Sequence, residues 1–325
     1  MRNEVDVLEN DIVKYKRNLL CVLLKDRTTN ENIIWATDDY ESRGLGYQYG
    51  DHINVDEITG VNGNVIKPRI EKTKEEHSVR IREKAEVFTS AVICNKQINL
   101  IDSAWFAKEN VFNEETANGW VASTKPIKFP AKGSKKWQDY VKNTRLEISC
   151  GEAPYLASRY DAVNGTPIEI NQRIGILDRK LRVICENVKN EEKWLEWAYI
   201  AFQNIYGYEW QGDNVLLARE NLLYTFVDYY KYKFKCEPKV EYLMKIADIL
   251  SWNIWQMDGI KLVIPGSCKE TKSGQIGLFG DDEKKKPCVG CAKNNQKLHT
   301  GIYCQVKDWE SNKTIKFISL LEEDI

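Results

Sequence analysis

The sequence predicts an α/β protein whose core is a doubly wound, mostly parallel sheet. The first observation behind this prediction is that short apolar segments alternate with segments of helical periodicity from about residue 137 onward, as in sheets joined by crossover helices. The second is that glycine or acidic residues directly follow the apolar segments, at the place where open parallel sheets bind ligands. The predicted strands cover 146–149, 205–209 and 252–258, and the predicted helices cover 191–205, 213–235 and 239–250.

The N-terminal part of the chain is predicted to be helical and irregular. Apolar residues recur at spacings of three and four over 6–25, which is typical of an amphipathic helix. Residues 33–36 predict a short strand, and the five glycines within 41–64 predict turns. A run of mixed charge at about 71–86 indicates a further helix, whose charges either face solvent or contact a phosphate backbone.

Length and composition limit the class of protein. The chain has 325 residues, 42% hydrophobic and 29% charged, with a mean hydropathy of −0.51 and no apolar run long enough to span a bilayer. It starts without the pattern of a signal peptide, so we expect a cytoplasmic protein in which the nine cysteines are reduced. A net charge of −1 gives no overall attraction to nucleic acid, and any such contact needs a local patch.

We expect three parts along this length. They are a helical or irregular N-terminal region (1–80), the α/β domain (81–265), and a C-terminal segment (266–325) that combines a polar linker, a cysteine-rich knuckle and a strand.

Residues at the ends of the predicted strands indicate a site for a nucleotide-like cofactor. Gly151 follows the first strand and lets a ligand approach the backbone closely, while the small Ala153 limits crowding. Glu209 ends the second strand, where a carboxylate can accept both hydroxyls of a ribose, and Asp258 follows the third, where it could accept from an exocyclic amine. Taken singly, each acidic residue is more often a cap or a surface charge. Trp210 is a candidate wall for an adenine ring, although core packing is the usual role of tryptophan.

These segments resemble the bacterial adenine-N6 DNA methylases, as found in the M subunits of restriction-modification systems. Residues 205–209 (Ile-Tyr-Gly-Tyr-Glu), with the helix that follows, resemble the acidic second motif of that family. Residues 146–156 are similar to its cofactor-binding first motif, although Glu152 and Pro154 replace the usual small residues. Residues 86–90 (Glu-Val-Phe-Thr-Ser) are similar to the preceding Phe-Thr-Pro element, with serine in place of proline. The resemblance covers roughly residues 80–265.

The resemblance implies a Rossmann-like methyltransferase domain that binds S-adenosylmethionine. It implies that Phe88 packs on the cofactor, that Cys150 and Gly151 line the methionine part, and that Glu209 and Asp258 hold the ribose and the adenine. The implied cofactor-binding residues are Phe88, Thr89, Glu147, Cys150, Gly151, Ala153, Glu209, Trp210 and Asp258.

One element of the family is missing from the sequence. Adenine methylases hold the target amine with Asn or Asp followed by Pro-Pro and an aromatic residue, and no such tetrapeptide occurs here. The nearest substitute is residues 308–311 (Asp-Trp-Glu-Ser), which is otherwise a plain strand-end turn. We therefore expect a DNA adenine-N6 methyltransferase, or M subunit, that works with a second subunit or a second copy of the chain. The alternative is an inactive homologue that binds DNA or acts as an assembly partner. The cofactor motifs do not specify the acceptor, so RNA and protein remain alternatives to DNA.

Cysteines near the C-terminus indicate a structural zinc site. Cys288 and Cys291 form a Cys-x-x-Cys pair around a glycine, and His299 and Cys304 follow. Three thiolates and one imidazole suit a closed tetrahedral zinc centre, which would stabilise a short segment with little core of its own. Cys268 is the alternative ligand if His299 is not one, and unpaired thiols are the alternative to a metal site.

Overall fold

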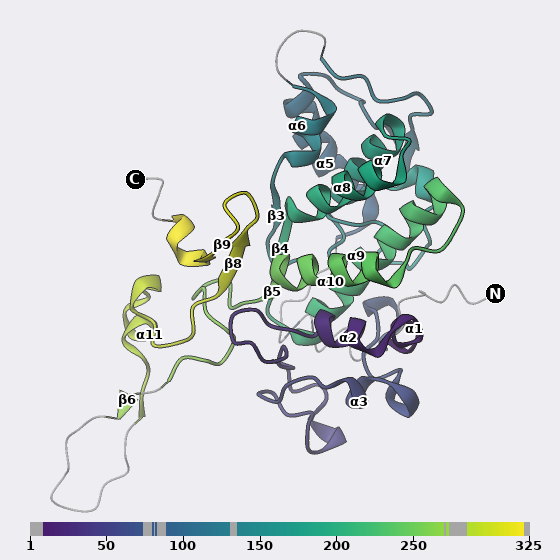
Figure 1. The fold of residues 1–325 in the computed structure, drawn as a ribbon. Coiled ribbons are helices and arrows are strands. Elements are labelled where there is room, and N and C mark those ends of the chain that lie inside the picture. Colours follow the sequence, from purple (N-terminus) through teal and green to yellow (C-terminus); the bar gives the residue numbers. More distant parts are fainter. Residues whose placement is uncertain are drawn as a thin grey trace, which may run out of the picture.

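The computed structural model describes residues 9–73, 80, 82, 89–130, 135–269, 271–272 and 285–321. In Figure 1, a small sheet lies beside a group of helices, and the C-terminal part of the chain projects from one side of this body.

The central sheet consists of three short parallel strands in the order β3 (Arg145–Glu147), β4 (Ile205–Glu209) and β5 (Ile254–Gln256). The register pairs Glu147 with Gly207 and Glu209 with Gln256. The three strands therefore end at nearly the same level, and the loops that follow them meet at one edge of the sheet.

Helices cover one face of this sheet. α8 (Glu191–Gln203), α9 (Gly212–Phe234) and α10 (Val240–Asn253) contact β4, and α9 and α10 also contact β5 (Figure 1). Side chains alternate along β4, so that Ile205 joins the main core on the helical side. This core extends from Ile12 to Ile254 and includes residues of the N-terminal region.

The other face of the sheet is covered by the C-terminal hairpin of β8 (Gln305–Asp308) and β9 (Lys313–Lys316). Tyr208, Trp255 and Phe317 form an aromatic group there, with ring centroids 5.3–6.2 Å apart. A second, smaller core lies between the sheet and the hairpin. Within the described residues, the sheet thus has helices on one face and a β-hairpin on the other.

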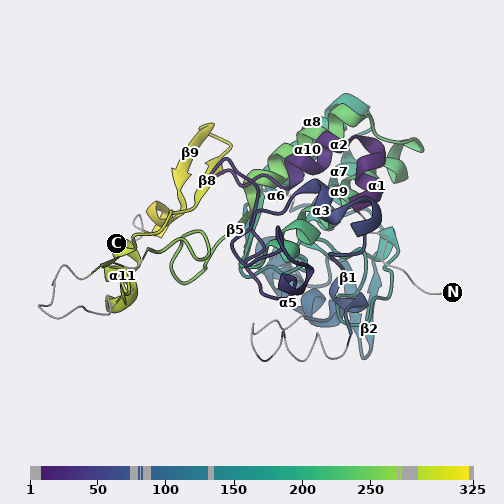
Figure 2. The ribbon, with the colours of Figure 1, turned by 90° about the horizontal axis from the view of Figure 1, so that it is seen from below.

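The remaining elements lie around this centre, as Figures 1 and 2 show. The helices are α1 (Glu9–Tyr15), α2 (Arg17–Leu23), α3 (Val55–Ile58), α5 (Ala91–Phe106), α6 (Trp137–Lys142), α7 (Ile176–Asn187) and α11 (Val289–Lys293). The strands are β1 (Asn113–Thr116), β2 (Gly119–Ala122), β6 (Thr271–Lys272) and β7 (Lys285–Lys286), and the 3-10 turns are Glu41–Arg43, Gly60–Asn62, Arg69–Glu71, Ile170–Gln172, Gln296–Leu298 and Phe317–Leu321.

A glycine at the start of α9 lets the N-terminal region approach the sheet. The Gly212 N–H donates to the Trp35 carbonyl at 2.9 Å, and a Cβ at this position would lie 2.0 Å from the Ile34 carbonyl oxygen. The Gln256 side chain of β5 donates to the Ile34 carbonyl and accepts from the Ile34 N–H. This segment therefore joins the wall beside the strand ends.

The mixed α/β class and the parallel sheet are confirmed, and the predicted elements 191–258 lie close to α8, β4, α9, α10 and β5. The predicted helix over 6–25 is divided at Lys16 into α1 and α2. The predicted strand at 33–36 is wrong, because this segment makes only an isolated bridge to His52. The helix predicted at 71–86 lies largely outside the described residues.

Candidate cofactor cleft and metal centre

A cleft of about 770 Å³ lies at the carboxyl ends of the three parallel strands. Residues following β3, β4 and β5 line it together, and the N-terminal region and the start of α9 complete its walls. The lining residues are Ala36, Tyr49, Thr89, Glu147, Ile148, Ser149, Cys150, Gly151, Pro154, Tyr155, Tyr208, Glu209, Trp210, Gln211, Asn214, Met257, Asp258, Gly259 and Ile260. The three predicted strand-end residues Gly151, Glu209 and Asp258 therefore surround one cavity.

The loop after β3 has an unusual backbone. Ser149, Gly151 and Ala153 have φ angles of 46°, 52° and 62°, in the left-handed region that non-glycine residues rarely adopt. Such conformations persist only where the surroundings hold them in place, and they cluster at functional sites. The Cys150 N–H donates to the Tyr208 carbonyl at 2.9 Å and fixes the loop to β4.

The Glu209 carboxylate connects the ends of two strands. Oε2 accepts from the Gly151 N–H at 2.9 Å, and Oε1 accepts from the Trp210 and Gln211 N–H groups at 2.8 and 3.3 Å. These bonds hold an anionic acceptor at the edge of the cleft, where ligand hydroxyls could share its oxygens.

Asp258 also takes part in the local backbone structure. Its Oδ1 accepts from the N–H groups of Ile260 and Lys261, each at 3.0 Å, and its Oδ2 pairs with the Lys261 ammonium at 3.2 Å. Asp258 therefore organises the turn after β5 as well as lining the cleft. Trp210 follows the neighbouring strand β4, and its indole N–H donates to the Ala36 carbonyl at 3.2 Å.

Two buried side chains of the cleft have raised pKa values. Burial raises the pKa of the Glu147 carboxyl to about 8. Hydrogen bonds from the N–H groups of Tyr155 and Leu156 lower this pKa in part, whereas the neighbouring Glu209 raises it further. Burial likewise raises the pKa of the Cys150 thiol well above its usual range. Cys150 is thus a neutral thiol at physiological pH, which does not favour a thiolate nucleophile here.

Seven of the nine predicted cofactor-binding residues line the cleft. Ala153 does not, because it is fully buried beneath the loop, and Phe88 lies outside the described residues. Ala36 and Tyr49 were missed by sequence reasoning. They reach the cleft through long-range pairing of their backbones, with the Ala36 N–H donating to the Tyr49 carbonyl at 2.8 Å, and no local motif marks this contact.

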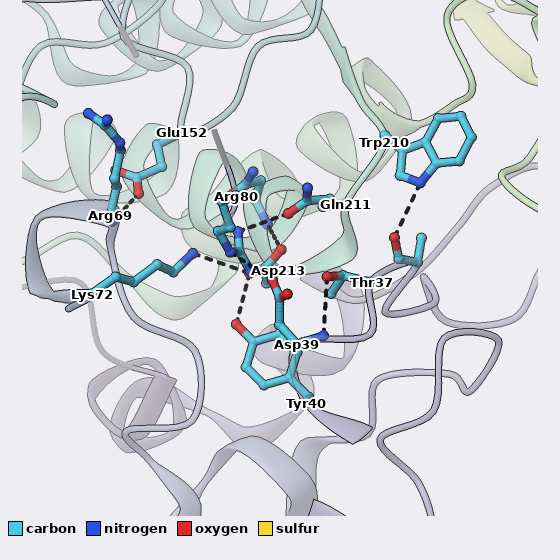
Figure 3. A network of polar contacts seen from close by, with 12 residues as sticks. Thr37, Asp39, Tyr40, Arg69, Lys72, Arg80, Glu152, Trp210, Gln211 and Asp213 are labelled. Atoms are coloured by element: carbon cyan, nitrogen blue, oxygen red, sulfur yellow. Dashed lines mark hydrogen bonds and ion pairs between the residues drawn. The ribbon is translucent and has the colours of Figure 1, made fainter. Parts of the chain in front are cut away.

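A buried ionic network anchors the wall of the cleft (Figure 3). The fully buried Asp213 carboxylate accepts from the Tyr40 hydroxyl at 2.8 Å and pairs with Arg80 and Lys72. Burial alone would raise the pKa of Asp213, but the two cations outweigh it and hold this pKa below its usual range. Arg80 also donates to the Gln211 side chain at 2.8 Å, so the network connects directly to a residue of the cleft.

A second cluster, in the C-terminal part, consists of three cysteines and one histidine. The ligand atoms of Cys268, Cys288, Cys291 and His299 all lie within 4.8 Å of one another. His299 Nδ1 lies 3.6, 3.5 and 3.7 Å from the sulfurs of Cys268, Cys288 and Cys291. Two ligands of one tetrahedral zinc ion, a sulfur and a nitrogen, are about 3.6 Å apart. The cluster could therefore bind a metal such as zinc.

The surrounding backbone supports metal binding. Backbone hydrogen bonds from Thr300 and Cys291 lower the pKa of the Cys288 thiol to about 5, and the Cys291 N–H lies 3.3 Å from the Cys288 sulfur. A lowered pKa favours the thiolate form that binds metals. Gly290 of α11 lets the helix pack closely on the segment of His299, because a Cβ there would lie 2.6 Å from the His299 backbone nitrogen.

The predicted ligand set needs one correction. Cys304 is not part of the cluster, because its fully buried thiol lies in the second core and donates to the Gln256 carbonyl at 3.4 Å. Cys268 takes the third thiolate position, alongside His299 rather than in place of it.

The metal cluster and the cleft share a wall. Asp258 lines the cleft and also a groove of about 230 Å³ that is bordered by Cys268, Cys288 and Cys291. The Gln296 side chain, just before His299, donates to the Ile260 carbonyl at 2.9 Å. The turn after β5 is therefore held between the sheet and the cluster of three cysteines and His299.

The residues 308–311 form a hairpin turn rather than part of the cleft. Asp308 accepts from the N–H groups of Glu310 and Ser311, and the Trp309 indole donates to Asn253, directly before β5, at 2.8 Å. This places the turn at the amino ends of the strands, away from the cleft.

Comparison with known proteins leaves the family open: no family model, curated protein or solved structure matches the chain. Among the described residues, no helix combines the length and the apolar character that crossing a membrane requires.

Proposed function

We propose that the chain is an S-adenosylmethionine-binding protein of the adenine-N6 DNA methylase type, acting as a methyltransferase subunit in a restriction-modification or phage-defence system. The observation that carries this proposal is that Gly151, Glu209 and Asp258, each following one of three adjacent parallel strands, line a single cleft. In a doubly wound sheet, a nucleotide-like cofactor binds at this edge. The sheet of β3, β4 and β5 would form one half of such a fold.

The residues of the cleft fit the chemistry of this cofactor. The volume of the cleft, about 770 Å³, lies within the roughly 300–1,000 Å³ of small-molecule sites. Glu209 would accept from the ribose hydroxyls and Asp258 from the adenine amine, while Trp210 would cover the adenine ring. The left-handed loop at Gly151 lets the methionine part approach the backbone.

The bound cofactor would supply an activated methyl group. The task of the chain's own residues is to orient it and to exclude water, since methyl transfer to an amine depends on positioning more than on a strong base. The high pKa of the Cys150 thiol suits this role, because a neutral thiol does not compete for the methyl group.

A non-catalytic homologue that binds cofactor or DNA is the second candidate. It is favoured by the absence of an Asn/Asp-Pro-Pro-aromatic tetrapeptide from the sequence, and by the position of the Asp308 turn away from the cleft. Transfer of tritium from labelled S-adenosylmethionine to DNA supports the methyltransferase. Cofactor binding without transfer, by the chain alone and with its partner subunit, supports the homologue.

Calorimetric titration with S-adenosylmethionine tests the cofactor site. We expect Glu209→Ala to weaken binding at least tenfold, which corresponds to about 1.4 kcal/mol for a lost charged acceptor. Asp308→Ala is a matched control, because Asp308 also accepts backbone N–H bonds from the residues that follow it. Equal affinities in the two variants, or no binding by the wild type, would contradict the proposal.

A further inference from the structure

We propose that the C-terminal part of the chain, which carries the Cys/His cluster, is a contact surface for the phosphate backbone of DNA next to the cleft. This inference rests on the proposed function, and it identifies where a DNA substrate would be held. We call residues 259–269 and 285–321 the metal lobe. Figure 1 shows most of this lobe projecting from the main body on the side of β5.

The charge of the metal lobe differs from that of the whole chain. The lobe as defined contains nine lysines and two acidic residues, Asp308 and Glu310, although the net charge of the chain is −1. A zinc ion with three thiolate ligands and one neutral imidazole has a net charge of −1, which a single lysine would balance. The excess of positive charge is therefore available to a polyanion.

Lysines surround the metal cluster on several sides. Lys269 follows the ligand Cys268, and Lys293 ends the short helix that carries Cys291. Lys316 comes from β9, and its ammonium lies 6.0 Å from the centre of the Tyr303 ring. The hydroxyl of Tyr303 accepts from the His299 N–H at 3.1 Å, which places Lys316 beside the knuckle. All three lysines are exposed.

Among the residues that the structure describes, no ion pair connects Lys269, Lys293 or Lys316 to a carboxylate. Neutralising a phosphate therefore does not require breaking an existing pair, and each contact would release condensed counterions from DNA.

The position of the lobe relative to the cleft favours DNA. The groove beside the metal cluster and the cleft share Asp258, and Ile260, which is 74% exposed, stands at the lining of the cleft. A base that enters the cleft must leave its duplex, and the flanking phosphates then need cationic partners close by. The exposed residues between the lysines include Asn294 and Asn295 rather than the tryptophans typical of membrane surfaces.

A charge-matched pair of triple variants tests this surface in the full chain. The lobe variant is K269Q/K293Q/K316Q, and the control is K108Q/K128Q/K189Q, which removes three exposed lysines from the main body. Binding of a fluorescein-labelled 20-base-pair duplex is measured by anisotropy between 50 and 200 mM salt. We expect the lobe variant to bind at least about tenfold more weakly at low salt. Its slope of log K against log salt should be shallower by about 2.7, because three phosphate contacts are lost.

The same proteins are titrated with S-adenosylmethionine and with phosphatidylserine vesicles. Unchanged cofactor binding and zinc content in the lobe variant, together with weakened DNA binding, support the inference. Equal DNA affinities and salt slopes in both triple variants would overturn it. Vesicle binding that depends on the lobe lysines, with DNA binding that does not, would also overturn it. A wild type that binds DNA through the lobe but does not bind the cofactor would refute the proposed function alone.

Discussion

Replacing Cys268 or Cys304 with serine distinguishes the ligand set of the structure from the one that sequence spacing predicts. Cys268 places its sulfur 3.6 Å from His299 Nδ1, whereas the Cys304 thiol is bonded to the Gln256 carbonyl in the second core. Structural zinc sites are worth about 10–16 kcal/mol. Divided among four ligands, loss of one thiolate costs about 3 kcal/mol, which is roughly a 150-fold weaker affinity.

Zinc retention is measured by elemental analysis and by competition with a chromogenic chelator. We expect about one zinc per wild-type chain, a roughly 150-fold loss of affinity in Cys268→Ser, and no loss in Cys304→Ser. Because Cys304 is fully buried, its serine variant should lower the free energy of unfolding while it retains metal. The opposite order of the two variants, or wild-type protein without zinc, would refute the reasoning.

Two further predictions concern buried charges. Asp213→Asn leaves the Lys72 side chain, which is 5% exposed, without its carboxylate, so we expect the free energy of unfolding in urea to fall by about 3 kcal/mol. Glu9 and Glu220 are both buried, and burial raises the pKa of Glu9 to about 8 and that of Glu220 well above its usual value. The folded chain therefore favours the protonated form of this pair. The free energy of unfolding that the protonated pair contributes is fully present below about pH 4.5 and is lost as the pH rises through about 8. We expect Glu220→Gln to gain about 1–2 kcal/mol relative to wild type between pH 5.5 and 8.5.

The Asp213 prediction has a surface control, and both predictions have a contradicting outcome. Asp56 pairs with Arg17 at the surface, with 84% of its side chain exposed, so Asp56→Asn should change stability by less than about 0.5 kcal/mol. A similar small effect of Asp213→Asn would show that the buried network does not hold the fold. A stability difference for Glu220→Gln that is constant with pH would show that the glutamate pair is ionised in the folded chain.

The sequence was most informative where periodicity is strong and local. Helices α8 and α10 each bury one face, so their apolar spacing marks their bounds closely, whereas α9 is buried on all sides over 212–227. The strand ends could be found for a similar reason, since Glu209 and Asp258 directly follow short apolar segments. That these ends share one cleft depends on the strand order, which periodicity does not specify.

The parts that sequence reasoning missed depend on contacts between distant residues. Sequence reasoning gave Cys268 only as the alternative to His299, because it precedes Cys288 by twenty residues. Its place beside His299 follows from the path of the chain rather than from spacing. Residues 33–36 have the composition of a strand, but their backbone groups bond to several separate partners, among them the Asp51 carbonyl, the Gln256 side chain and the Gly212 N–H. They make an isolated bridge rather than a continuous strand ladder. Neither arrangement leaves a local signal in the sequence.

A crystal structure of the chain grown with S-adenosylmethionine tests the central claim most directly. We predict density for the nucleoside in the cleft, with the ribose at Glu209, the adenine near Asp258 and the methionine part along the loop at Gly151. Density for the cofactor at another place, or an unchanged cleft at millimolar cofactor, would contradict the account.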